Sequence, residues 1–131
     1  MIGGRHYSGS TYEELCGYAR VVVDGDMVYV SGTIGMNYET GEMSDDVVEQ
    51  TKQCFRNIEE ALAKAGASKD GLLRIRVFIA DREDFKSVAP LIGEFCRSAR
   101  PANTSVASPL LEKRMKIEIE VTARKSAGGD S

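Results

Sequence analysis

Two glutamates in one short segment are the residues of this chain best suited to acid–base chemistry. Glu118 and Glu120 alternate with aliphatic residues in KIEIEVTA, residues 116–123. Successive side chains of a β-strand point to opposite faces of the sheet, so both carboxylates would share one face, with Arg74 or Arg76 as neighbours. A carboxylate beside an apolar wall loses hydration, which raises its proton affinity and suits it to exchange protons. Glu120 is therefore a candidate general acid and base.

Nucleophilic and metal chemistry have weaker support. His6 is the one histidine in the sequence, so a Ser–His or Cys–His pair or a site with several imidazole ligands is not expected. The three cysteines, Cys16, Cys54 and Cys96, form no CxxC motif. We expect reduced thiols in a cytoplasmic protein, with Cys54 and Cys96 packed on apolar helix faces. The segment SGTIG, residues 31–35, lacks the lysine and spacing of a phosphate-binding loop, and no cofactor signature is recognisable.

The composition indicates one globular domain without a nucleic-acid or membrane partner. A chain of 131 residues can build one hydrophobic core, and we expect a single domain over residues 1–131. Its 17 basic and 20 acidic residues give a net charge of -3, which leaves no basic stripe for a phosphate backbone. No apolar run approaches the roughly 20 residues that cross a bilayer, and no signal peptide is recognisable. The polar ends, about 1–10 and 125–131, are expected to be flexible.

The first half of the chain predicts a hairpin followed by a helix. An Asp-Gly pair at 24–25 separates two β-branched runs, which indicates strands near 18–23 and 26–32 joined by a tight turn. A helix should follow, capped by Ser44 and ended by Gly66. Its apolar positions recur every three or four residues: Val47, Thr51, Cys54, Phe55, Ile58, Ala61, Leu62 and Ala65.

The second half predicts a strand, a helix and two more strands. Residues 72–80 alternate along their length. One face of that strand carries Leu73, Ile75, Val77 and Ile79. A second amphipathic helix should be capped by Ser87, which places Pro90 in its first turn, where a missing N–H is tolerated. Strands at about 103–108 and 115–123 complete the order ββαβαββ.

This order indicates an α+β domain with a mixed β-sheet and both helices packed on one face. The helix-free face would carry charges of both signs, from Arg74 and Arg76 and from Glu118 and Glu120. Such a face either meets water, as in many antiparallel sheets, or is covered by another subunit. The alternation alone does not choose between these two states.

Five segments together resemble the RidA (YjgF) family, also called endoribonuclease L-PSP. They are GYARVVV at 17–23, VYVSGTIG at 28–35, EQTKQCFRNIEEALAKAGAS at 49–68, RPANTSV at 100–106 and KIEIEVTA at 116–123. The resemblance implies a chorismate-mutase-like, RidA-type fold and a homotrimer with a small-molecule cleft between neighbouring subunits. The best-known members hydrolyse enamines and imines, and deaminase activity without a cofactor or metal is the corresponding expectation. The ribonuclease activity in the family's older name is disfavoured by the acidic charge and the lone histidine.

The resemblance also assigns roles to individual residues. Tyr18 matches the family's cleft tyrosine. Ser31 and Gly32 match its Ser-Gly pair, which would line the substrate site. Glu120 matches the glutamate that positions the attacking water.

The resemblance breaks at RPAN, where active members have RPAR. Asn103 stands in the place of the catalytic arginine, and Ser105 in the place of a frequently reactive cysteine. An arginine grips a carboxylate through charge-assisted, bidentate hydrogen bonds, whereas asparagine donates a neutral one. Either the cleft prefers ligands other than the usual 2-aminoacrylate-type acids, or Arg20, on the same strand face as the cleft tyrosine, supplies the missing cation. Alternatively, Arg20 pairs with Glu118, Glu120 or another carboxylate of that face.

Two functions stay open at this point. The chain is either a hydrolase that uses Glu120 with Asn103 and Tyr18, or a non-catalytic, metabolite-binding trimer that kept the cleft. Glu13 and Glu14, just before the first predicted strand, either reach the cleft or form a solvated charge pair.

Overall fold

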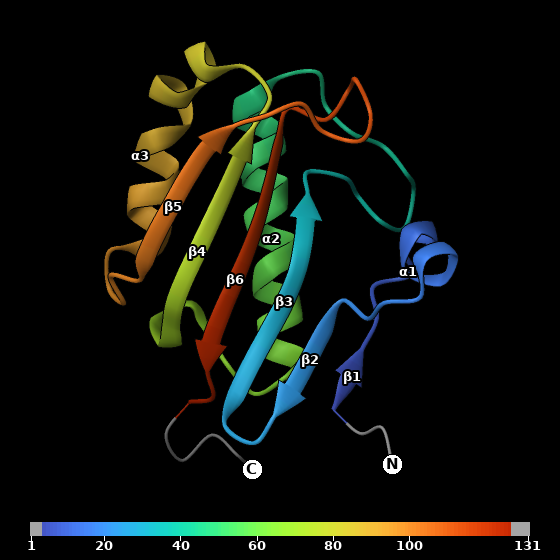
Figure 1. Ribbon diagram of the computed structural model, residues 1–131, viewed down its shortest axis with the longest axis vertical. Helices are drawn as coiled ribbons and strands as arrows, with labels where there is room; N and C mark the ends of the chain where they lie inside the picture. The colour runs from blue at the N-terminus through green and yellow to red at the C-terminus, as the bar shows by residue number, and fades with distance from the viewer. Residues whose placement is uncertain (1–3, 127–131) are drawn as a thin grey trace.

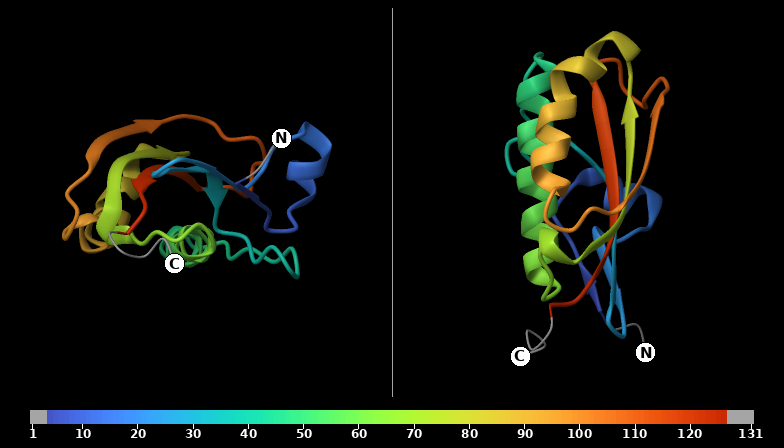
Figure 2. Two further views of the ribbon diagram at one scale, coloured as in Figure 1. Left: turned by 90° about the horizontal axis from the view of Figure 1, so that it is seen from below. Right: turned by 90° about the vertical axis from the view of Figure 1, so that its left-hand side faces the viewer.

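A six-stranded sheet with two helices on one face forms the body of the molecule. The computed structural model describes residues 4–126. The sheet order is β1-β2-β3-β6-β4-β5. Helices α2 and α3 pack side by side on one face, the short α1 lies beyond the β1 edge, and no helix of residues 4–126 covers the opposite face (Figures 1 and 2). The elements are β1 (Arg5–His6), α1 (Thr11–Cys16), β2 (Val21–Asp24), β3 (Met27–Ile34), α2 (Val47–Lys64), η1 (Lys69–Gly71), β4 (Leu72–Ile79), η2 (Arg82–Asp84), α3 (Phe85–Cys96), β5 (Ala102–Ala107) and β6 (Ile117–Arg124).

The predicted α+β class and mixed sheet are confirmed. β4 and β5 pair in parallel, whereas the other neighbouring strands pair antiparallel. From β2 onward the elements follow the predicted order ββαβαββ. The predicted hairpin is the β2–β3 pair, which turns at Gly25 with a positive φ of 61°.

The N-terminal segment before β2 contains two elements that the sequence pattern did not indicate, β1 and α1. Arg5 and His6 pair with Val22 and Val21 of β2, so the described part of the expected flexible segment adds an edge strand. A short helix, α1, follows it. Residues 1–3 and 127–131, which also belong to the expected flexible tails, lie outside the described residues.

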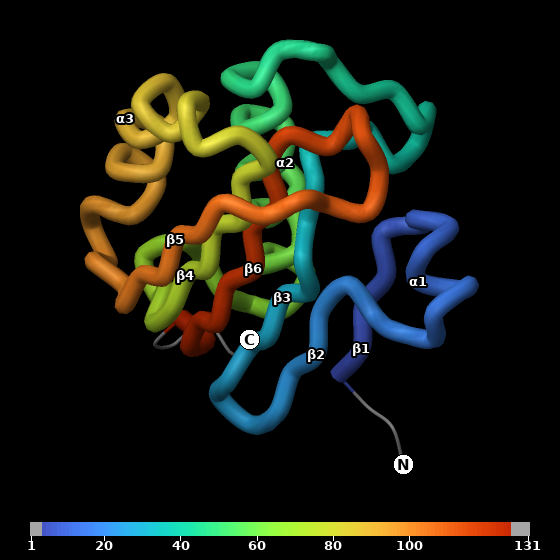
Figure 3. Tube along the Cα trace, turned by 45° about the horizontal axis from the view of Figure 1, so that its top comes forward, coloured from blue at the N-terminus to red at the C-terminus, as the bar shows by residue number. Residues whose placement is uncertain are grey.

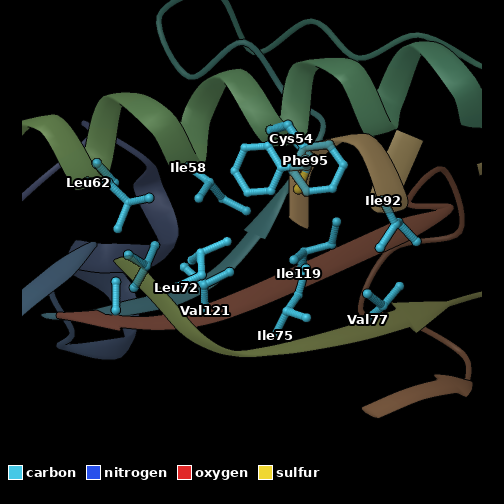
Figure 4. Close-up of a cluster of buried hydrophobic side chains, with 14 of the residues drawn as sticks. Cys54, Ile58, Leu62, Leu72, Ile75, Val77, Ile92, Phe95, Ile119 and Val121 are labelled. Carbon is cyan, nitrogen blue, oxygen red and sulfur yellow. The ribbon is translucent and has the colours of Figure 1, made fainter. Parts of the chain in front are cut away.

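The hydrophobic core lies between α2, α3 and the sheet (Figure 4). Ile58 and Leu62 of α2 and Ile119 of β6 have no exposed surface. Each such side chain contributes about 1.5–3 kcal/mol by leaving water. Phe55 and Phe95 stack between the two helices, with ring centroids 4.1 Å apart. The segment 116–123 therefore has the predicted orientation: its aliphatic residues point toward the helices and its glutamates lie on the helix-free face.

Both helices begin at residues other than those expected. Asp46, not Ser44, is the N-cap of α2, and its carboxylate accepts a hydrogen bond from the backbone N–H of Glu49 at 3.0 Å. The second helix is not capped by Ser87, and Pro90 lies inside α3. The short 3-10 turn η2 runs directly into α3, and Asp81 caps that turn instead, which moves the start upstream of the proline.

A bulge changes the face of one residue in β4. The register with β6 shifts between Leu72 and Arg74. Leu72 is therefore 3 % exposed and joins the core, whereas Leu73, which was expected there, is 42 % exposed. Over residues 4–126, no helix has the length and apolarity needed to cross a bilayer.

Candidate functional site

A β-bulge in β3 forms the centre of the candidate site. Val30 pairs with Val121 and Thr33 with Ile119, so the two residues between them, Ser31 and Gly32, oppose a single residue of β6. Bulges interrupt the regular ladder and re-aim the side chains around them. The Ser31 hydroxyl donates to the Ala19 carbonyl at 2.7 Å, which ties the bulge to the strand entry beside it.

Arg20 holds this bulge from inside the protein. It is 3 % exposed, and its Nη1 donates to the Gly32 carbonyl at 2.6 Å and to the Thr33 hydroxyl at 3.1 Å. Its Nε donates to the Glu13 carboxylate at 3.0 Å, and both side chains of this ion pair are 4 % exposed. Its guanidinium carbon lies 5.0 Å from the Tyr38 ring centroid, within cation–π distance. Burial raises the pKa of Tyr38 to about 12, so its hydroxyl stays protonated.

Helix α1 places both the carboxylate and the tyrosine beside Arg20. Ser10 caps α1, and Gly17 ends it in the left-handed region at φ 74°. Glu13, inside this turn, also accepts hydrogen bonds from the backbone and hydroxyl of Ser8. Tyr18 follows directly, and its ring centroid is 5.8 Å from the Arg20 guanidinium carbon. Glu13 is thus buried rather than part of the solvated pair expected for it.

The Glu118 carboxylate lies against Gly32. A Cβ at position 32 would overlap Glu118 Oε2, so the carboxylate can occupy this place only beside a glycine. Burial raises the pKa of Glu118, Arg20 opposes that shift, and the neighbouring Glu120 adds to it. Among residues 4–126, no group donates a hydrogen bond to this carboxylate. It is therefore a half-buried carboxyl group that is free to bind or protonate a ligand.

A small pocket of about 40 Å³ opens at this carboxylate. Its walls include Tyr18, Arg20, Gly32 and Glu118, together with Leu111 from the β5–β6 connection. That connection crosses the end of β3 toward α1 (Figures 1 and 3). A cavity needs about 10–15 Å³ to hold one water, so the pocket has room for a water or a very small ligand group.

Two contacts fix the β5–β6 connection over the pocket. Tyr12 of α1 donates to the Glu112 carboxylate at 2.6 Å, which lowers the pKa of Glu112 and raises that of Tyr12. Gln50 of α2 has no exposed surface; it donates to the Arg114 carbonyl at 2.8 Å and accepts from the Lys116 N–H at 2.9 Å. The wall of the pocket therefore depends on side chains from two helices.

Glu120, the glutamate predicted to act, is the residue of β6 that lies opposite the Ser31–Gly32 bulge. It forms an ion pair with Arg76 at 3.4 Å, with both side chains well exposed. It does not line the pocket with Tyr18; Glu118 does. Alternation places both glutamates on one face, so the sequence pattern alone does not show that Glu118, and not Glu120, lines this pocket.

Asn103 and Ser105 are not brought to this pocket within one chain. They lie in β5, where every residue is exposed, opposite Ile75 and Val77 of β4. The Ser105 hydroxyl donates to the Asn103 side-chain oxygen at 2.9 Å. Strands β4 and β6 separate β5 from the bulged strand β3. Ser31, Gly32, Tyr18 and Arg20 do meet in one place, as expected.

The pairing alternative for Arg20 is the one found, with a carboxylate that the strand pattern did not suggest. Its partner is Glu13 rather than Glu118 or Glu120. Glu14 is exposed. The three cysteines form no disulfide; Cys54 is buried, which raises its pKa, and Cys96 is partly buried. In the described part of the chain, no three His, Cys, Asp or Glu side chains come together as a metal site would require.

The fold and the pocket define a class: small α+β proteins with two helices behind a mixed sheet and a Ser-Gly bulge beside a half-buried glutamate. Residues 10–125 match the model of the endoribonuclease L-PSP family, and the chain belongs to this family, which confirms the RidA/YjgF resemblance.

Relatives and solved structures agree with this assignment. The 2-iminobutanoate/2-iminopropanoate deaminase of Dermatophagoides farinae is 33% identical over 79% of this chain and 81% of its own length. The human protein of the same name is 33% identical over 81% of this chain and 78% of its own. A crystal structure of a YjgF/YER057c/UK114 family member from Mycobacterium tuberculosis superposes with a TM-score of 0.83 at 31% identity, covering 92% of this chain and 97% of that one.

Proposed function

We propose that this protein hydrolyses a small imine or enamine, with Glu118 as its general acid and base. The observation that carries the proposal is the half-buried Glu118 carboxylate, which lies against Gly32 with a raised pKa and no hydrogen-bond donor from residues 4–126. A carboxylate with increased proton affinity is the group that proton transfer near neutral pH requires. Two relatives carry the name of imine deaminases, which supports the reaction class.

The reaction needs one water and one group that moves protons. In the proposed sequence the water oxygen bonds to the imine carbon, and Glu118 takes one proton from that water and passes it to the imine nitrogen. In the resulting carbinolamine Glu118 then takes the hydroxyl proton and delivers it to the amine nitrogen as the C–N bond breaks, so that a carbonyl compound and ammonia leave. The bulge and Tyr18 position the substrate beside the carboxylate. An enamine enters the same route after protonation at carbon.

The proposal includes a homotrimer, because a single chain leaves the site incomplete. β5 is exposed throughout, and the helix-free face carries the exposed side chains of Tyr29 and Val106. In a ring of three copies, Asn103 and Ser105 of the partner subunit would complete the pocket at the interface. The free cysteines fit a reducing compartment, and we place the protein in the cytoplasm.

The charges around the pocket favour a neutral substrate over the usual 2-aminoacrylate-type acids. The Arg20 cation is balanced by Glu13, and two of its three nitrogens are already engaged. Glu118 adds a negative charge at neutral pH once it is ionised, and Asn103 brings none. A substrate carboxylate would therefore enter next to the Glu118 carboxylate, while Glu13 already balances the charge of Arg20.

Ammonia release from a panel of acidic and neutral imines tests the proposal. Glu118→Gln should reduce kcat/KM by at least about 100-fold, the usual contribution of a positioned acid or base. Glu120→Gln is the matched control and should retain activity within about threefold, since exposed pairs contribute little. Asn103→Arg should shift preference toward acidic imines. Equal losses in the two glutamine variants would contradict the assignment of Glu118.

A second candidate is a non-catalytic, small-molecule-binding trimer of the same family. The replacement of the catalytic arginine by Asn103 favours it. Substrate turnover by neither the wild type nor Asn103→Arg, together with ligand binding that Glu118→Gln weakens, would support this second function over the first.

A further inference from the structure

A second and larger pocket lies on the α2 side of Arg20, apart from the Glu118 carboxylate. Its volume is about 140 Å³. One stripe of α2 supplies Asn57, Glu60 and Lys64, and the rest of the wall comes from the lead of the chain and the turn after β3. Arg20 and Tyr38 border both pockets, whereas Glu118 borders only the smaller one.

Arg20, which borders this pocket, has an unused donor. Its Nε and Nη1 are taken by Glu13, Gly32 and Thr33, and Nη2 has no partner among residues 4–126. Every fully enclosed side-chain nitrogen or oxygen of the described chain has a partner, so Nη2 reaches an open space. A guanidinium that is 3 % exposed and has a free edge is a strong anion-binding group.

A second cation and an unpaired carboxylate complete the charge pattern. Lys64 donates to the Tyr7 carbonyl at 2.9 Å, which leaves its charge without a carboxylate. Glu60 lies one turn earlier on α2, yet within the described residues it forms neither an ion pair nor a hydrogen bond. Lys64 has thus turned away from its i−4 partner toward the lead of the chain. The lining therefore carries two cations, Arg20 and Lys64, and two carboxylates, Glu39 and Glu60.

We propose that this pocket binds a small zwitterionic amino acid, with its carboxylate at Arg20 and Lys64 and its ammonium group at Glu60. A ligand with one charge would leave the opposite charge of the wall unpaired, which costs affinity. The volume of about 140 Å³ accommodates several heavy atoms, compared with about 10–15 Å³ for one water. Carboxylate binding at Nη2 does not require the Arg20–Glu13 pair to break.

Isothermal titration of the full chain without substrate tests this proposal, so its outcome is independent of the proposed hydrolase activity. The probes are glycine, alanine and serine, with propionate and ethylamine as single-charge analogues of alanine. Alanine should bind at least about tenfold more tightly than either analogue, since one charged contact is worth about that factor. Equal affinity for propionate or ethylamine would overturn the zwitterion assignment.

Variants locate the binding on exposed residues whose substitution leaves the core intact. Glu60→Gln and Lys64→Gln should each weaken alanine binding by at least about tenfold. Glu59→Gln is the matched control, because Glu59 neighbours Glu60 on α2 but lies outside the pocket lining. The proposal fails if no amino acid binds at up to about 10 mM, if either pocket variant binds alanine as the wild type does, or if the control loses as much affinity as they do.

Discussion

The two glutamates of β6 occupy one face of one strand, two residues apart, and yet have different environments. Glu118 lies against Gly32 of the bulged strand, half-buried and without a hydrogen-bond donor from residues 4–126. Glu120 pairs with Arg76 across the neighbouring strand, in contact with solvent. The comparison teaches that the neighbouring backbone, more than the position in the alternation, decides which carboxylate can do chemistry. A single bulge and a single glycine make that difference.

The largest expected difference is between the ion pairs near these two glutamates. Arg20 pairs with Glu13 beside the Glu118 pocket, and Arg76 pairs with Glu120. Arg20→Met would leave Glu13 buried without its partner and the Gly32 carbonyl without its donor, which should destabilise the protein by about 3–5 kcal/mol. Arg76→Met breaks only the exposed pair with Glu120 and should cost less than about 1 kcal/mol. Urea unfolding of the two variants measures both values.

A double variant shows whether the stability lost in Arg20→Met comes from the unpaired Glu13 charge or only from the changed side-chain shape. Glu13→Gln combined with Arg20→Met removes the orphaned charge, so part of the lost stability should return. Comparable stability of Arg20→Met and Arg76→Met would contradict the distinction between the buried and the exposed ion pair.

A smaller effect is expected from adding one methyl group at the bulge. Gly32→Ala must displace the flexible end of the Glu118 side chain, so we expect little loss of stability but a loss of about 10- to 100-fold in activity, since misplacing a reacting group by about 1 Å has that effect. Gly93→Ala is the control, because its Cβ would meet only the flexible end of Arg97 at 3.1 Å. The control should keep its activity and, as an alanine within a helix, its stability. An active Gly32→Ala would separate Glu118 from the chemistry.

The smallest expected effect is the pH-dependent change in stability caused by Glu118→Gln. Because burial raises the pKa of Glu118 above its ordinary value of 4.5, the ionised form is disfavoured in the folded state. Glu118→Gln should therefore raise the melting temperature at pH 7, and this gain should disappear as the pH falls below 4.5, where the carboxyl is protonated in both states. Glu120→Gln should show no such gain. Thermal unfolding across this pH range checks the sign, and a gain that persists at low pH would contradict it.

Sequence periodicity predicted the elements whose burial follows a regular repeat. The aliphatic residues of β6 and the stripe of α2 face the core as expected, because one register satisfies both the pattern and the sheet. The start of α3 was not predicted because η2 extends the helix upstream of Pro90. The exposure of Leu73 was not predicted because a bulge changes the face of that residue. Both are local irregularities that leave no repeat in the sequence.

The candidate site was predicted in part for the same physical reasons. Tyr18, Arg20, Ser31 and Gly32 meet as expected because they lie on adjacent segments of one hairpin. The sequence pattern does not distinguish Glu118 from Glu120, since alternation assigns both to the same face; the role predicted for Glu120 stays a prediction. The burial of Glu13 depends on the short helix α1, whose few residues carry too little periodicity to be recognised.

The sheet order has a consequence for the synthesis of the chain. β6, the last strand of the described residues, lies between β3 and β4, so these two strands have no common partner until Ile117–Arg124 has been made. Until then both expose an unpaired inner edge and the apolar face that β6 later completes, a state prone to association with other chains. The sheet therefore closes from its middle, after the ribosome has finished nearly the whole domain, and a chain interrupted before Ile117 would be a ready substrate for chaperones or proteases.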